Sequence, residues 1–162
     1  MEQVTHNFEP VFDSRSQVLI LGTFPSVKSR ESNFYYGHPQ NRFWKVTAAL
    51  TKSPVPQTIE EKKAMLLAGH IAVCDVIASC EIEGSSDSSI KNVIPNDIGS
   101  LLERSSIQKV YCNGGKAYEL YVRYCEKKTG VKAGKLPSTS PANAAWSLER
   151  LTESWRKEIC LQ

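Results

Sequence analysis

One loop of the chain combines backbone amides with aromatic rings in a pattern suited to holding a planar ring. The tight turn 22–26, Gly-Thr-Phe-Pro-Ser, has backbone N–H groups that can point toward an anion, and its Phe24 supplies an aromatic face. Three more aromatics follow: Phe34, Tyr35 and Tyr36. These rings either line a pocket for a planar ligand or only pack the loop onto the protein.

The string His38-Pro39-Gln40-Asn41 places a side-chain amide at the expected start of a helix. Asn41 is either the N-cap of that helix or an amide aimed at a water or a ligand. Both roles use the same side-chain atoms, so the sequence leaves the two alternatives open.

A second polar loop, 136–143 (LPSTSPAN), is stiffened by two prolines. It is either a plain capping loop or, through its amides and hydroxyl groups, a grip for phosphate groups. Three basic side chains lie near it in the sequence and would supplement that grip: Lys132, Lys135 and Arg150.

Other common kinds of chemistry find no support in the sequence. Neither the dinucleotide pattern GxGxxG nor the P-loop pattern GxxxxGK[ST] occurs. The 5 cysteines include no CxxC pair, and the 3 histidines are scattered, so we expect free thiols, no metal and no cofactor.

The elements that position these loops alternate between strands and helices. Apolar runs predict strands at 17–22, 71–77, 109–112 and 132–136, and helical spacing or caps predict helices at 41–52, 59–68, 97–104, 115–128 and 147–159. We expect loops at 23–40 and, in a Ser-rich stretch, at 81–91. The alternation predicts a three-layer α/β/α fold around a central four-stranded parallel sheet. Ligands bind at the carboxyl ends of such strands, which is where the unusual loops lie.

Length and composition agree with one globular unit. The 162 residues, 41% hydrophobic and 23% charged, predict a single domain, 1–162. No apolar run approaches the roughly 18–20 residues of a membrane helix, and the first residues form no secretory signal, so we expect a cytoplasmic protein with no membrane contact. The net charge is +3, and its basic excess lies in the second half, as a phosphate-bearing partner would require.

Taken in order along the chain, GTFPS, YYGHPQN, HPQNRFWK and LPSTSPAN resemble the uracil-DNA glycosylase superfamily. A Gly-x-x-Pro motif after the first strand and a Ser/Pro-rich loop after the last are typical of that superfamily. The HPxNRFWK string is similar to the mismatch-specific uracil-DNA glycosylases, whereas GTFPS and YYGHPQN look closer to the hypoxanthine-DNA (deoxyinosine) glycosylase branch. The resemblance covers residues 18–159.

The resemblance implies roles for individual residues. The position that often handles the attacking water in uracil-specific members is Phe24 here, so that task passes to Asn41, which positions water. Phe24 then stacks on the extruded base while the amides of Thr23 and Phe24 bind its edge. Asp75 occupies the position at which uracil-specific members have an Asn that selects uracil. Here Asp75 either braces a loop or accepts a hydrogen bond from N1–H of hypoxanthine.

The remaining implied contacts complete a base pocket and a DNA-binding loop. Tyr36 lines the base pocket, and Asn113 is a turn residue or a further base contact. Four residues of the second polar loop are expected to wedge and grip the DNA backbone: Ser138, Ser140, Pro141 and Asn143.

The implied activity is that of a monofunctional DNA glycosylase, because no lysine within the motifs offers a Schiff-base nucleophile. We expect a monomer that acts on double-stranded DNA containing a deaminated base, namely hypoxanthine. Two alternatives stay open: a mismatch-specific uracil or thymine glycosylase, and a non-catalytic module that binds damaged DNA.

Overall fold

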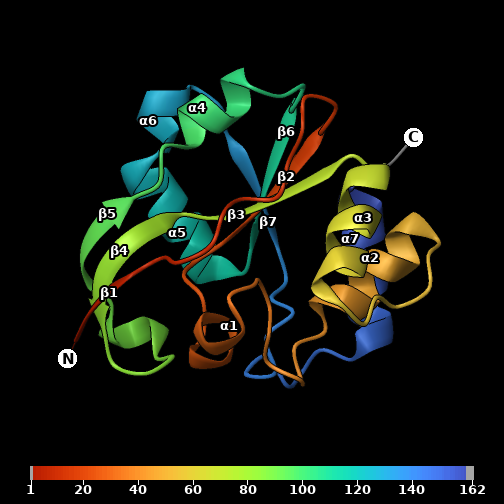
Figure 1. The fold of residues 1–162 in the computed structure, drawn as a ribbon, viewed down its shortest axis with the longest axis horizontal. Coiled ribbons are helices and arrows are strands. Elements are labelled where there is room, and N and C mark those ends of the chain that lie inside the picture. The colour runs from red at the N-terminus through yellow and green to blue at the C-terminus, as the bar shows by residue number, and fades with distance from the viewer. Residues whose placement is uncertain (1, 160–162) are drawn as a thin grey trace.

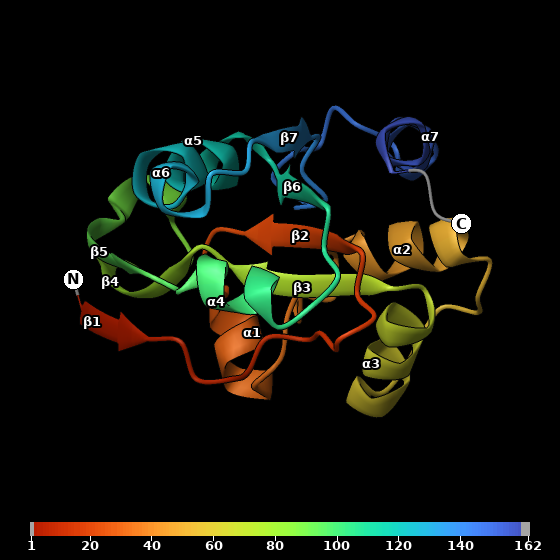
Figure 2. The same ribbon diagram turned by 90° about the horizontal axis from the view of Figure 1, so that it is seen from above.

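A four-stranded parallel sheet forms the centre of the computed structural model, which describes residues 2–159. Its order is β3-β2-β6-β7, with β3 at Ile71–Asp75, β2 at Val18–Gly22, β6 at Lys109–Asn113 and β7 at Ala133–Leu136. Figure 2 shows the four strands side by side. The predicted parallel sheet is confirmed.

Both faces of the sheet are covered, because its strands are apolar on both sides. In β2, Val18 and Ile20 belong to one apolar core, and Leu19 and Leu21 belong to the other. The first core is completed by helices α2 (Phe43–Thr51), α3 (Ile59–Ala68) and α7 (Leu148–Glu158); the second by α4 (Ile98–Glu103) and α5 (Gly115–Tyr124). Figure 1 shows the two groups of helices on opposite sides of the sheet, which is the predicted three-layer arrangement.

The predicted strand 71–77 is wrong only in its last two residues, since β3 ends at Asp75. The chain turns at Val76 and starts β4 (Ile77–Ile82), which lies between β1 (Glu2–Thr5) and β5 (Lys91–Pro95) in a separate antiparallel sheet. The backbone N–H groups of Val76 and Ile77 still donate to the carbonyls of Gly22 and Thr23 at the end of β2, so the change of sheet occurs beside that strand end. The predicted loop 81–91 is therefore shorter and contains a 3-10 turn, Asp87–Ser89.

Two other predicted segments differ from the structure. The loop 23–40 contains a short helix, α1 (Val27–Ser32), because the Ser26 side chain accepts a hydrogen bond from the backbone of Ser29. The predicted helix 115–128 breaks at Cys125 into α5 and α6 (Glu126–Thr129).

The remaining helix predictions agree with the structure. Helix α3 has its predicted bounds, and Thr58 caps it by accepting from the backbone of Glu61. Within residues 2–159, no helix is long and apolar enough to cross a membrane. Four cysteines are buried free thiols: Cys74, Cys80, Cys112 and Cys125; Cys160 lies outside the described residues.

Candidate active site

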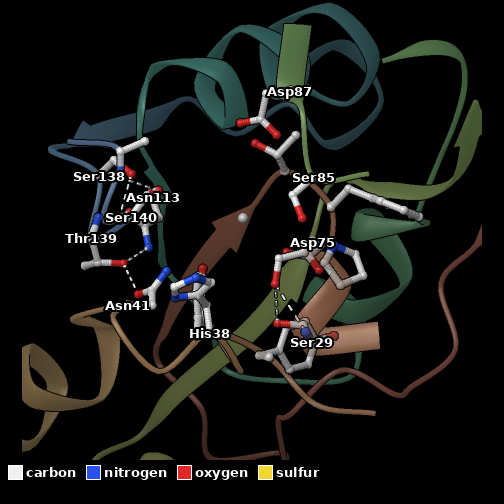
Figure 3. Close-up of a pocket in the computed structure, with 18 of the residues that line it drawn as sticks. Ser29, His38, Asn41, Asp75, Ser85, Asp87, Asn113, Ser138, Thr139 and Ser140 are labelled. Atoms are coloured by element: carbon white, nitrogen blue, oxygen red, sulfur yellow. Dashed lines mark hydrogen bonds between the residues drawn. The ribbon is translucent and has the colours of Figure 1, made fainter. Parts of the chain in front are cut away.

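The carboxyl ends of the four parallel strands surround a cavity of about 310 Å³. Nine of the predicted site residues line it: Thr23, Phe24, Tyr36, Asn41, Asp75, Asn113, Ser138, Ser140 and Pro141. Asn143 lines a neighbouring groove instead. Figure 3 shows the polar residues of the cavity converging from separate segments of the chain.

The side chain of Asn41 is locked in one orientation. Its Oδ1 accepts hydrogen bonds from the backbone of Phe43 at 2.9 Å and from Oγ1 of Thr139 at 2.8 Å. Asn41 therefore serves the start of α2 and a second element at once. Because both donors hold Oδ1, the Nδ2 group is left to face the cavity as a hydrogen-bond donor (Figure 3).

Thr139, to which the sequence analysis assigned no role within its loop, connects Asn41 to β6. Its Oγ1 accepts from Nδ2 of Asn113 at 3.0 Å, and its backbone N–H donates to Oδ1 of the same residue at 3.0 Å. Thr139 is fully buried. Asn113 thus lines the cavity while both ends of its amide brace the neighbouring loop.

Arg42 holds the Ser/Thr loop, residues 138–143, in place. Its guanidinium donates to the backbone carbonyls of Ser140 at 2.9 Å and Asn143 at 3.0 Å, and it also contacts that of Trp146. Its backbone N–H donates to the carbonyl of Thr139. Arginine presents several donors in a fixed plane, so one side chain can satisfy several loop carbonyls.

The aromatic rings of the first loop divide into two groups. Phe34 is buried in the core and stacks on Trp44 with ring centroids 5.9 Å apart, so packing is its main role; Tyr35 is also buried but lines the cavity as well. Tyr36 stacks on Phe43 at 4.0 Å and also lines the cavity, where its buried hydroxyl lies beside the side chain of Asn113. Burial, and then the charge of Asp75, raise the pKa of Tyr36 above its usual 10.0, which keeps that hydroxyl protonated.

The floor of the cavity places the carboxylate of Asp75 beside the hydroxyl of Tyr36. A methyl group added to Gly22 would overlap Oδ1 of Asp75 and lie 3.0 Å from the Tyr36 oxygen. Both oxygens therefore occupy the space that a side chain at position 22 would fill. Oδ2 of Asp75 forms a hydrogen bond with Nε2 of His6, at 2.9 Å.

A loop that showed no chemical pattern in the sequence forms the opposite wall. Ser85 and Asp87 line the cavity from this loop, and Oγ of Ser85 accepts a hydrogen bond from the backbone of Val27 at the start of α1. Burial raises the pKa of Asp87, and the positive charge of Lys116 opposes that rise. The wall therefore adds a second carboxyl group to the cavity.

The structure offers no obvious place for a metal ion. Among residues 2–159, no group of three or more His, Cys, Asp or Glu side chains is arranged to bind one. The groups that meet at the cavity include two carboxyl groups, two carboxamides, a phenolic hydroxyl and an aromatic ring. Such a set is suited to binding a polar planar ring by its edge and its face.

The chain belongs to the uracil DNA glycosylase superfamily, whose family model matches residues 9–161. This confirms the family that the sequence motifs predicted.

Within the superfamily, two curated relatives are named hypoxanthine DNA glycosylase. The one from Methanosarcina acetivorans is 34% identical over 154 residues, covering 93% of this chain and 95% of the relative. The one from Methanosarcina barkeri is 30% identical over 152 residues, covering 91% and 93%. A solution NMR structure of a Methanosarcina acetivorans protein assigned as a uracil DNA glycosylase has a TM-score of 0.77 and 33% identity, with 90% of this chain and 91% of that chain covered.

Proposed function

We propose that this protein is a monofunctional DNA glycosylase that removes hypoxanthine from double-stranded DNA and leaves an abasic site. The observation that carries the proposal is the pairing of a carboxylate acceptor, Asp75, with a hydroxyl donor, Tyr36, on the cavity floor. The names of the two curated relatives support the same substrate. The chain acts as a monomer in this proposal.

The acceptor and donor on the cavity floor match the lactam edge of hypoxanthine. In this base an N1–H donor lies beside the O6 acceptor, so Asp75 accepts from N1–H while Tyr36 donates to O6. Adenine presents the reverse pattern, an N1 acceptor beside an amino donor, so the carboxylate of Asp75 faces a nitrogen without hydrogen and the donation from Tyr36 is lost. A site built for hydrogen bonds rejects a base that cannot make them far more strongly than an apolar pocket does.

The turn after β2 completes the base pocket in this proposal. Phe24 stacks on the face of the extruded base, and the backbone N–H groups of Thr23 and Phe24 donate to its edge. The ring of Phe24 is itself held by the edge of the His6 ring, with centroids 6.1 Å apart. Preformed donors of this kind stabilise negative charge on the departing base by several kcal/mol.

Hydrolysis requires water at the sugar carbon as the base leaves. The Nδ2 group of Asn41 holds this water by donating to its oxygen, since Oδ1 is already occupied. The water oxygen bonds to C1′, and the bond from C1′ to the base nitrogen breaks with its electron pair on the base. The proton that the attacking water loses passes to solvent, and the base anion takes up a proton from solvent. Among the described residues no lysine lines the cavity, which supports a monofunctional reaction.

The Ser/Thr loop grips the DNA backbone in this proposal. Oγ of Ser138 accepts from the backbone of Ser140, and Oγ of Ser140 accepts from that of Ala142, so each hydroxyl hydrogen can be given to a phosphate. Asn143 instead donates to the carbonyl of Ser138 and braces the loop. Pro141 lies at the rim of the cavity, where it separates the extruded base from its neighbours.

The test is an alkali-developed cleavage assay on duplexes that carry one hypoxanthine, uracil, xanthine or mismatched thymine. We expect cleavage at hypoxanthine, loss of that cleavage in Asn41→Ala, and normal cleavage in Gln57→Ala, an exposed amide outside the cavity. Cleavage at uracil alone would show that uracil, and not hypoxanthine, is the substrate. Tight DNA binding without cleavage at any base would refute the enzymatic function.

A further inference from the structure

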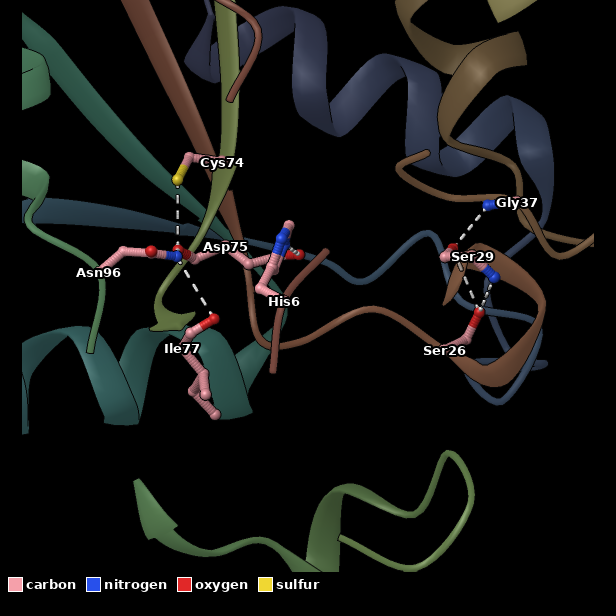
Figure 4. Close-up of polar contacts among 8 residues, drawn as sticks. All are labelled: His6, Ser26, Ser29, Gly37, Cys74, Asp75, Ile77 and Asn96. Atoms are coloured by element: carbon pink, nitrogen blue, oxygen red, sulfur yellow. Dashed lines mark hydrogen bonds and ion pairs between the residues drawn. The ribbon is translucent and has the colours of Figure 1, made fainter. Parts of the chain in front are cut away.

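His6 contacts the base-reading carboxylate from the N-terminal segment of the chain. Its Nε2 lies 2.9 Å from Oδ2 of Asp75, and the two side chains are only 7% and 5% exposed. They lie 69 residues apart in the sequence. Figure 4 shows His6 beside Asp75, which is the last residue of β3.

The ring of His6 is held on several sides. Its centroid lies 4.4 Å from that of Phe8 and 5.6 Å from that of Tyr35, and its edge contact with Phe24 completes the enclosure. The backbone N–H of His6 donates to the carbonyl of Ala78 in β4 at 2.7 Å. The imidazole therefore meets Asp75 from a fixed position.

The backbone of Asp75 is fixed separately, so only its side chain needs to be oriented. Its carbonyl accepts from Nδ2 of Asn96 at 2.8 Å and from Sγ of Cys74 (Figure 4). Among the described residues, His6 is the hydrogen-bond partner of the carboxylate. Without it, the carboxylate is free to rotate toward the neighbouring tyrosine hydroxyls, which would remove the acceptor from the cavity.

We propose that His6 is a positioning residue for base selection: it donates from Nε2 to Oδ2 of Asp75 and so keeps Oδ1 turned to the cavity as an acceptor for a base N–H. This inference rests on the proposed function. Donation to Oδ2 is available from the neutral ring with its proton on Nε2 and from the imidazolium. A carboxylate held in this way accepts a hydrogen bond from a base N–H group. It forms no hydrogen bond with a base nitrogen that carries no hydrogen.

Two substitutions separate this role from packing. His6→Phe keeps a ring against Phe8 and Tyr35 but removes the donor, whereas His6→Gln restores an N–H near the position of Nε2. Each variant is titrated with duplexes that carry a 2′-fluoro nucleotide, whose N-glycosidic bond resists cleavage, with hypoxanthine or unsubstituted purine as the base. Purine has no N1–H, so its binding does not depend on the Asp75 acceptor.

We expect His6→Phe to weaken binding of the hypoxanthine duplex by about 10- to 100-fold, the range for a hydrogen bond to a charged group. Binding of the purine duplex should change by less than about 3-fold, and His6→Gln should recover most of the loss, as expected for a specific pairwise interaction. Thermal melting of each variant shows whether the fold is kept.

The inference is overturned if both duplexes lose affinity equally, which would indicate a structural role, or if neither loses affinity. Its failure is distinguishable from that of the proposed function. Wild-type protein that does not cleave at hypoxanthine refutes the function, whereas wild-type cleavage with an unchanged ratio of the two affinities in His6→Phe refutes only the role of His6.

Discussion

Replacing Thr139 with valine should disconnect Asn41 from the loop that orients it. Valine has nearly the same shape as threonine, so the substitution keeps the packing of this fully buried side chain. It removes the hydroxyl that donates to Oδ1 of Asn41 and accepts from Nδ2 of Asn113. The carboxamide of Asn41 then keeps one of its two hydrogen bonds, that from Phe43.

The magnitude follows from the two side-chain groups that lose a partner. An unsatisfied buried group costs about 1–3 kcal/mol; Asn41 and Asn113 are both half-buried and Asn41 keeps one of its bonds, so the free energy of unfolding should fall by about 1–3 kcal/mol. For a chain of this length that lowers Tm by roughly 2–12 °C. Because Asn41 can then rotate its amide, the excision rate should fall by about 10- to 100-fold.

Thermal melting and single-turnover excision from a hypoxanthine duplex measure the two effects. Thr139→Ser is the matched control, since it keeps the hydroxyl and loses only a methyl group. It should retain most of the wild-type excision rate. A valine variant that works at the wild-type rate would show that Asn41 does not depend on Thr139. A serine variant as slow as valine would assign the effect to packing.

Three further predictions concern other parts of the structure. Gly22→Ala should reduce excision by at least about 10-fold in single-turnover assays, because its methyl group displaces the carboxylate of Asp75, whereas Gly99→Ala in α4 should have no effect. Arg42→Lys should speed proteolysis of the Ser/Thr loop, since lysine lacks the planar donors. Burial raises the pKa of the Cys125 thiol from 9.0 to about 11, so the unfolded chain loses this proton first. Urea unfolding should therefore show stability falling from pH 9 to 11, less steeply in Cys125→Ala.

The parallel sheet could be predicted because its strands are short apolar runs next to polar loops. The antiparallel sheet could not, because β5 is largely exposed and shows no apolar alternation, and because β1 pairs with a strand more than 70 residues further along the chain. The turn at Val76 was hidden for a different reason. It lies inside the run 71–77, which is apolar except for Asp75, and the chain is extended on both sides of it, so no residue type marks the change from one sheet to the other.

Candidate site residues were recognisable where a motif carried them, and missed where they act through other residues. Arg42 stands in the same string as Asn41, yet it binds backbone carbonyls, so no acidic residue elsewhere in the sequence points to it. Thr139 looks like any threonine of a polar loop. His6 is distant in sequence from Asp75, and only the path of the N-terminal segment beside β4 brings the two together.

The chemistry of the cavity floor favours selectivity at some cost in rate. A carboxylate that accepts from N1–H of the base repels the negative charge that the base gains as its glycosidic bond breaks. The hydroxyl of Tyr36 and the backbone amides after β2 must offset this repulsion, and Asn41 cannot help because a carboxamide takes up no proton at neutral pH. Base selection therefore depends on the carboxylate of Asp75, whereas stabilisation of the departing base depends on the hydroxyl of Tyr36 and the backbone amides after β2. Gly22 leaves room for both groups, since a methyl group there would overlap Oδ1 of Asp75 and lie 3.0 Å from the Tyr36 oxygen.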